Sequence, residues 1–398
     1  MMYKIDIEER VLHFKQPAGT SRGVYTERRI WLVTATDGVN VGMGECAPLP
    51  DLSCDALPPN IYNNVLRRFC DEVEQTGTIP YEALRPYPSM LFGLETALLS
   101  LEWRVESGEF LDEPSGAAER AVAPLVTDGT AVARSASPLG SSKNSTLYTL
   151  HSTLFAKGKE GIPINGLVWM GTYEEMLQRI EEKLRQGFRC IKLKIGAIAF
   201  DDELQLIKHI RQRFSHREVE LRVDANGAFG PRPEVPSRQL LDDALYKLEL
   251  LSQYALHSIK QPIRAGQWAN MAELCRESPL PIALDEELIG INDAEQKRQM
   301  LNIIRPAYIV LKPSLHGGMA GCREWIDTAH DMGIGSWITS ALESNVGLNA
   351  IAQFCADVYG PGITMPQGLG TGQLFTDNIP MPIEIRGDKL WVKKIICP

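Results

Sequence analysis

The sequence has little of the chemistry that marks secreted, zinc-binding or membrane-spanning proteins. Its eight cysteines are scattered and form no Cys-x-x-Cys pair, so neither a zinc knuckle nor a disulfide framework is indicated. No apolar run approaches the ~20 residues that a membrane helix needs. Residues 1–9 lack the apolar core of a secretory signal. These absences predict a protein of the reducing cytoplasm.

Positive charge is scarce relative to negative charge. The 41 Lys and Arg residues face 50 Asp and Glu residues, which gives a formal net charge of −9. This balance argues against a nucleic-acid or anionic-membrane partner, and it leaves the oligomeric state open. The chain is rich instead in apolar residues, at 44% of 398 residues. That is enough for a large core and suits two domains.

The N-terminal part predicts an α+β domain. Strand patterns fill residues 3–46, and a helical period follows over residues 60–108, so strands come first and helices second. We place this domain at residues 1–111. Residues 112–146 are rich in Ala, Ser, Gly and Pro and have no aromatic residue, which predicts a flexible insertion.

Residues 147–374 predict a closed α/β barrel. Short apolar strands alternate there with helical segments, up to a last extended piece near Ile363, and this alternation is typical of a parallel sheet. With about eight such strands, a barrel is favoured over an open sheet. The tail at 375–398 holds a short strand pattern that we expect to return to the N-terminal domain.

Charged residues end several of the predicted barrel strands. The segment Ile-Lys-Leu-Lys-Ile alternates apolar and basic residues, so Lys192 and Lys194 share one face. Asp224, Asp285 and Lys312 end later strands, at separations of one, two and one strand–helix units of roughly 30 residues. Because barrel active sites lie at the C-terminal ends of the strands, we expect these side chains to converge.

Each signal has an ordinary structural explanation when taken alone. One Asp at a strand end is more often a helix N-cap, and one Lys-x-Lys pair is more often solvated on an edge strand. The combination is more specific. Carboxylates from different strands suit a hard cation such as Mg²⁺, and lysines beside them suit proton abstraction next to a carboxylate.

Together these motifs resemble the enolase superfamily, in its muconate-cycloisomerase-like group, and most of all the o-succinylbenzoate synthase family. The resemblance covers nearly all of the chain except about 112–146. It is carried by residues 42–50, 192–194, 224–226, 284–286, 311–313, 340–344 and 368–372. Racemases of N-acylamino acids and dipeptide epimerases have similar motifs, so these activities remain alternatives.

The resemblance implies an α+β capping domain, formed by the N-terminal region and the C-terminal tail, over a TIM-like (β/α)7β barrel. It implies a lyase of menaquinone biosynthesis that eliminates water, in syn geometry, from 2-succinyl-6-hydroxy-2,4-cyclohexadiene-1-carboxylate through a metal-stabilised enediolate. Lys194 matches the lysine that removes the α-proton, and Lys312 the lysine that stabilises the enediolate from the opposite face. Lys192 matches an auxiliary lysine near the substrate carboxylate. Asp224 and Asp285 match ligands of Mg²⁺ or Mn²⁺.

Other residues are candidates for substrate binding. Arg22 lies in a loop that we expect to close over a small carboxylate substrate. Asn226 and Ser340 follow strand ends and would present polar groups at the same rim. Gly368 opens the matching glycine-rich segment.

One position departs from the family pattern. The family places a third carboxylate ligand, a Glu, at the end of strand four, and Lys260 stands there in this chain. Lys260 removes a ligand and repels a cation, and its ammonium could pair with Asp224 and Asp285 instead. We therefore expect weakened metal binding and an impaired enzyme, or a non-catalytic barrel that still binds substrate. Glu286 is a possible substitute ligand, although the next residue on a strand starts out pointing away.

This departure generates a first prediction. Lys260→Glu should raise both the affinity for Mg²⁺ and the rate of dehydration by orders of magnitude, because it restores an oxygen ligand to a hard cation. Titration of Mg²⁺ into both proteins, with turnover measured alongside, checks it. Equal affinity and equal rate in the two proteins would mean that another group, Glu286 first, already completes the site.

Overall fold

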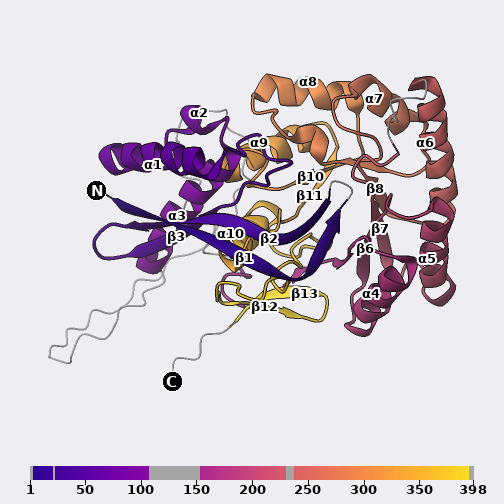
Figure 1. The fold of residues 1–398 in the computed structure, drawn as a ribbon, viewed down its shortest axis with the longest axis horizontal. Coiled ribbons are helices and arrows are strands. Elements are labelled where there is room, and N and C mark those ends of the chain that lie inside the picture. Colours follow the sequence, from indigo (N-terminus) through magenta and orange to yellow (C-terminus); the bar gives the residue numbers. More distant parts are fainter. Residues whose placement is uncertain (1–2, 21–22, 107–152, 230–236, 394–398) are drawn as a thin grey trace, which may run out of the picture.

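The computed structural model describes residues 3–20, 23–106, 153–229 and 237–393. Arg22 and the predicted insertion at 112–146 lie outside the described residues. Figure 1 shows the N-terminal elements, in indigo and purple, beside a ring of later strands and helices. Within the described part of the chain, no helix combines the length and the apolar composition needed to cross a bilayer.

The N-terminal elements form an antiparallel sheet covered by helices. The sheet order is β1-β2-β3, and its strands are β1 (Lys4–Thr20), β2 (Gly23–Thr36) and β3 (Val41–Cys46). The helices are α1 (Pro59–Thr76), α2 (Tyr81–Leu84) and α3 (Pro88–Glu106). Trp31 on β2 stacks on Tyr62 of α1 with ring centroids 4.1 Å apart. This contact lies in a core that the sheet and the helices share.

The second half of the chain forms the parallel sheet of a barrel. Its strands are hydrogen-bonded in chain order. Within the described residues they are β5 (Gly166–Val168), β6 (Cys190–Lys194), β7 (Glu220–Asp224), β8 (Ser258–Lys260), β9 (Ile282–Leu284), β10 (Tyr308–Leu311) and β11 (Gly335–Ile338). The helices between and after them are α4 (Tyr173–Arg185), α5 (Phe200–Arg213), α6 (Ser237–Ser252), α7 (Trp268–Glu277), α8 (Ala294–Ile304), α9 (Gly318–Asp331) and α10 (Asn345–Tyr359).

Gln367 and Gly368 close the barrel. The amide of Gly368 donates to the carbonyl of Ile338 at 2.8 Å, after β11. The amide of Gln367 donates to the carbonyl of Pro163 at 2.8 Å, before β5. This pair therefore takes the place of the eighth strand, and the predicted barrel with an α+β capping domain is confirmed. The closing strand was expected near Ile363 and that position was wrong, because the edges of the sheet are joined a few residues later.

The alternation of β6 decides what reaches the inside of the barrel. Ile191 and Leu193 are fully buried in the core between the strands and the outer helices. Lys192 and Lys194 consequently project from the opposite face, into the barrel. The alternation with a period of two, which predicts a strand, therefore also places both lysines on the inner face of the barrel.

Two buried carboxylates of the capping domain bind the N-termini of barrel helices. Glu95 on α3 accepts from the amides of Met319 and Ala320, at 2.5 and 3.0 Å, at the start of α9. Glu45 on β3 accepts from the amide of Ser344 at 2.8 Å and that of Gly347 at 2.9 Å, at the start of α10. Such carboxylates satisfy unpaired amides and face the positive end of the helix dipole. They fix the capping domain over the barrel.

The C-terminal segment divides its contacts between the two halves. Phe375 bridges Phe14 on β1, with ring centroids 4.6 Å apart. The strands β12 (Ile383–Arg386) and β13 (Lys389–Val392) then form a small sheet with β4 (Ile162–Pro163), next to the start of the barrel. These contacts do not test the domain limits predicted from the sequence, 1–111 and 147–374, which stay predictions.

The helix-capping contacts generate a stability prediction. Glu95→Ala should lower the free energy of unfolding by about 2–4 kcal/mol, because two amides at the start of α9 lose their side-chain acceptor. Thermal or urea unfolding measures it. Glu72→Ala, on the exposed side of α1, is the matched control and should melt with the wild type. Equal melting temperatures of the wild type and both variants would show that Glu95 does not stabilise the contact between the capping domain and the barrel.

Candidate active site

A pocket opens at the C-terminal ends of the barrel strands, under the capping domain. It encloses about 670 Å³ of space, which includes open solvent at its mouth. Its polar lining includes Lys192, Lys194, Lys260 and Lys312. Its apolar lining includes Trp169 and Leu167 from the barrel, and Tyr25, Leu49 and Leu52 from the capping domain. The pocket thus combines basic and apolar surfaces.

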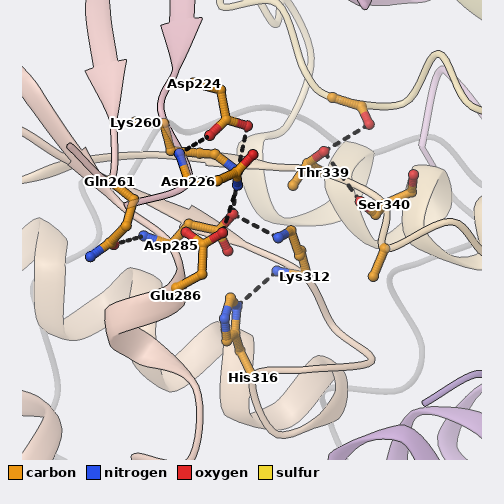
Figure 2. Close-up of polar contacts among 12 residues, drawn as sticks. Asp224, Asn226, Lys260, Gln261, Asp285, Glu286, Lys312, His316, Thr339 and Ser340 are labelled. Carbon is orange, nitrogen blue, oxygen red and sulfur yellow. Dashed lines mark hydrogen bonds and ion pairs between the residues drawn. The ribbon is translucent and has the colours of Figure 1, made fainter. Parts of the chain in front are cut away.

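Five charged residues alternate in sign along the pocket floor: Lys192, Asp224, Lys260, Asp285 and Lys312. We call them the lysine–aspartate row. Asp224 Oδ2 lies 2.9 Å from both Lys192 Nζ and Lys260 Nζ. Lys260 Nζ also donates to Asp285 Oδ2, which accepts from Lys312 Nζ at 2.6 Å. Figure 2 shows Lys260 between the two carboxylates. Each buried charge of the row is therefore paired with an opposite charge.

The register of the parallel strands explains the row. Lys194 on β6 is aligned with Asp224 on β7, and Asp224 is aligned with Lys260 on β8. Paired residues of neighbouring parallel strands project from the same face of the sheet, which here is the inside of the barrel. The charged heads therefore meet inside the barrel although they are far apart in the sequence.

Burial and ion pairing act against each other in the row. Both aspartates are fully buried, which opposes their ionisation, yet the neighbouring lysines hold the pKa of Asp224 and of Asp285 well below the usual range. Burial also opposes the charge of Lys260, but the two aspartates outweigh it and raise the pKa of Lys260. Lys260 is consequently a fixed ammonium.

Lys194 has a different environment from the lysines of the row. Its Nζ donates to the neutral amide oxygen of Asn226 at 2.9 Å and lies 3.9 Å from Asp224 Oδ2. It also lies 5.4 Å from the centroid of the Trp169 ring. Burial lowers the pKa of Lys194 to about 7, although Asp224 opposes the shift. An amine that is partly unprotonated near neutral pH can act as a general base.

Lys312 faces Lys194 across the barrel. The strands β6 and β10 are separated by three others in the sheet order, which puts them on opposite walls of a barrel closed at an eighth position. The backbone amide of Lys312 donates to His316 Nδ1 at 2.9 Å, and burial lowers the pKa of His316 to about 3. The neutral imidazole therefore holds the Lys312 backbone and adds no charge to the site.

The residues at the expected metal position do not fit a divalent ion. Lys260 already occupies the space between Asp224 and Asp285. Glu286, the expected substitute ligand, accepts from Asn226 Nδ2 at 2.6 Å. Among the described residues, no three His, Cys, Asp or Glu side chains are placed to hold one ion. An ion at this point would have to displace an ammonium from two carboxylates.

The structure brings most of the candidate residues together. Asn226, Ser340 and Gly368 line the same pocket as the lysines, and Ser340 Oγ lies 2.6 Å from Thr371 Oγ1. A Cβ on Gly368 would lie 2.1 Å from Thr339 Oγ1, so only glycine allows this close approach of the closing strand. The roles assigned to these residues stay predictions.

The sequence reasoning missed the apolar part of the pocket. Trp169 follows β5, so the same reading of strand ends that found the charged residues could have found it. Leu49 and Leu52 come from a loop of the capping domain. No local pattern signals their position, because the docking of the two domains sets it.

The comparisons with known proteins agree with this architecture. Residues 175–389 match the family model described as enolase C-terminal domain-like. An o-succinylbenzoate synthase from Desulfotalea psychrophila is 43% identical over 96% of this chain and 96% of its own length. The crystal structure of MenC from the same strain, at 37% identity, superposes with a TM-score of 0.70 over 98% of this chain and 100% of that one.

The fold is shared more widely than the sequence. A dipeptide epimerase from Enterococcus faecalis, solved with Mg and the dipeptide L-Leu-L-Tyr, has a TM-score of 0.73 at 16% identity, over 99% of this chain and 97% of that one. At this identity the likeness concerns the fold alone. The family model and the 43% identical relative are decisive, and the chain belongs to the enolase superfamily.

Proposed function

We propose that the chain is an o-succinylbenzoate synthase, a lyase that dehydrates 2-succinyl-6-hydroxy-2,4-cyclohexadiene-1-carboxylate for menaquinone biosynthesis. The observation that carries this proposal is the pair Lys194 and Lys312 on opposite walls of one pocket, with unequal partners. The high identity to a named o-succinylbenzoate synthase supports it. The substrate has a ring and two carboxylates, which suits a pocket with apolar walls and a basic floor.

The proposed reaction uses Lys194 twice. Its neutral amine takes the proton from the ring carbon that bears the carboxylate, and the electron pair moves into that carboxylate to form an enediolate. The ammonium of Lys194 then gives its proton to the hydroxyl on the neighbouring carbon as the C–O bond breaks. Water leaves and the ring becomes aromatic, so one base on one face suffices for a syn elimination.

Lys312 has an electrostatic task in this mechanism. Its Nζ is ion-paired with the fully buried Asp285 at 2.6 Å, on the face opposite Lys194. A charge fixed before the reaction stabilises the enediolate without reorganisation. Lys192, paired with Asp224, is placed to bind a carboxylate of the substrate.

The unequal partners of Lys194 and Lys312 favour the dehydratase over a racemase or epimerase. A racemase or epimerase needs a base on each face of the substrate, one to remove the proton and one to return it. Lys194 Nζ donates to a neutral amide oxygen, whereas Lys312 Nζ donates to a buried carboxylate. The pocket therefore suits one base and one fixed cation.

A substitution tests the assignment of the base. Lys194→Ala should lower turnover of the cyclohexadiene substrate by about 10²–10⁴-fold or more, because a single group serves as base and acid. The loss of substrate or the appearance of o-succinylbenzoate measures it. Lys208→Ala, exposed on α5, is the control and should match the wild type. Near wild-type turnover by Lys194→Ala would remove that residue from the mechanism.

An isotope experiment separates the two activities. In D₂O the wild type should form o-succinylbenzoate, and it should introduce little deuterium at the α-carbon of N-succinylamino acids or of dipeptides. Mass spectrometry of the recovered substrates measures the exchange. Rapid α-exchange with inversion, and no dehydration, would favour the racemase or epimerase instead.

A further inference from the structure

We infer that the Lys260 ammonium itself binds the ring carboxylate of the substrate and stabilises the enediolate, so that turnover requires no divalent metal ion. This inference rests on the proposed dehydration. It assigns a catalytic task to the one residue that departs from the family pattern.

The geometry places Lys260 where a cation would act. Its Nζ is held between Asp224 and Asp285 on the floor of the pocket, and the residue lines that pocket although it is only 4% exposed. An ammonium has three N–H groups. Two carboxylate partners leave at least one N–H for an oxygen of a ligand above the floor.

The charges of the site also favour Lys260 over a metal ion. Without it, Asp224 and Asp285 would share the positive charges of Lys192 and Lys312, and the centre of the row would be negative. With it, the row carries one net positive charge, with basic heads lining the pocket. A divalent ion added at the same point would expel a buried ammonium from both of its partners, which is strongly unfavourable.

The chemistry needs a positive charge at this position. Proton abstraction next to a carboxylate places a second negative charge on its oxygens, and a donor fixed beside them lowers the barrier. Lys260 offers one charge and N–H donors, whereas a divalent ion offers two charges. The ammonium should therefore support a slower reaction than a metal would, in agreement with the impairment expected from the sequence.

The wild-type protein tests the inference without any substitution. After treatment with EDTA, and with its metal content measured by mass spectrometry, the chain should dehydrate the cyclohexadiene substrate at an unchanged rate. Added Mg²⁺ or Mn²⁺ should change neither that rate nor the melting temperature. Loss of turnover in EDTA with recovery in Mg²⁺ would overturn the inference and leave the proposed function standing. No dehydration with or without metal would overturn both.

Variants at Lys260 test whether the charge of its side chain is needed for turnover. Lys260→Met should lower kcat by about 10²–10³-fold in EDTA, the usual loss for one fixed donor, and Mg²⁺ should not restore it. Lys260→Glu should be equally slow in EDTA, yet Mg²⁺ should raise its turnover above that of the wild type and raise its melting temperature. Wild-type kcat in either variant in EDTA would show that Lys260 neutralises the aspartates and does nothing more.

The chain offers a matched control for burial. Lys297 on α8 is as buried as Lys260, at 1% exposure, and it donates to Glu324 at 2.8 Å outside the active-site pocket. Lys297→Met should destabilise the fold and leave kcat unchanged. If Lys260→Met fails to fold, the metal dependence of the wild type and of Lys260→Glu still decides the inference.

Discussion

The active site depends on the pairing of buried charges in the lysine–aspartate row. Asp224 and Asp285 are fully buried, and unpaired carboxylates in that position would be protonated or would destabilise the barrel. Lys192, Lys260 and Lys312 compensate them and at the same time line the pocket. One set of contacts therefore stabilises the barrel interior and gives the pocket its positive floor.

The capping domain is linked to this floor through backbone groups. Glu45 and Glu95 bind the first amides of α10 and α9, and Arg28 donates to the carbonyl of Leu342 at 3.2 Å, in the loop after β11. These bonds join fixed points of the barrel to the domain that carries Leu49 and Leu52. The apolar cover of the pocket is therefore set by the same elements that hold the domains together.

The sequence predicts the charged half of the site better than the apolar half. Lys194, Asp224 and Lys312 follow from periodicity and spacing, since the C-terminal ends of parallel barrel strands lie at one rim. The closing strand at Gln367–Gly368 was misplaced because it is too short to have a period. The pairing of Glu95 with α9 depends on two segments over 200 residues apart in sequence, and no local pattern encodes it.

In the inferred mechanism, the side chain of Lys260 takes the place of a bound ion. A metal site needs several oxygen ligands and a supply of the ion, whereas a lysine carries its charge on the chain and is present in every folded molecule. The exchange is possible here because Asp224 and Asp285 can accept from an ammonium as readily as they coordinate a cation. In the proposed reaction, Lys260 would bring one positive charge to the enediolate where a divalent ion would bring two, and the remaining lysines of the pocket would have to supply the difference.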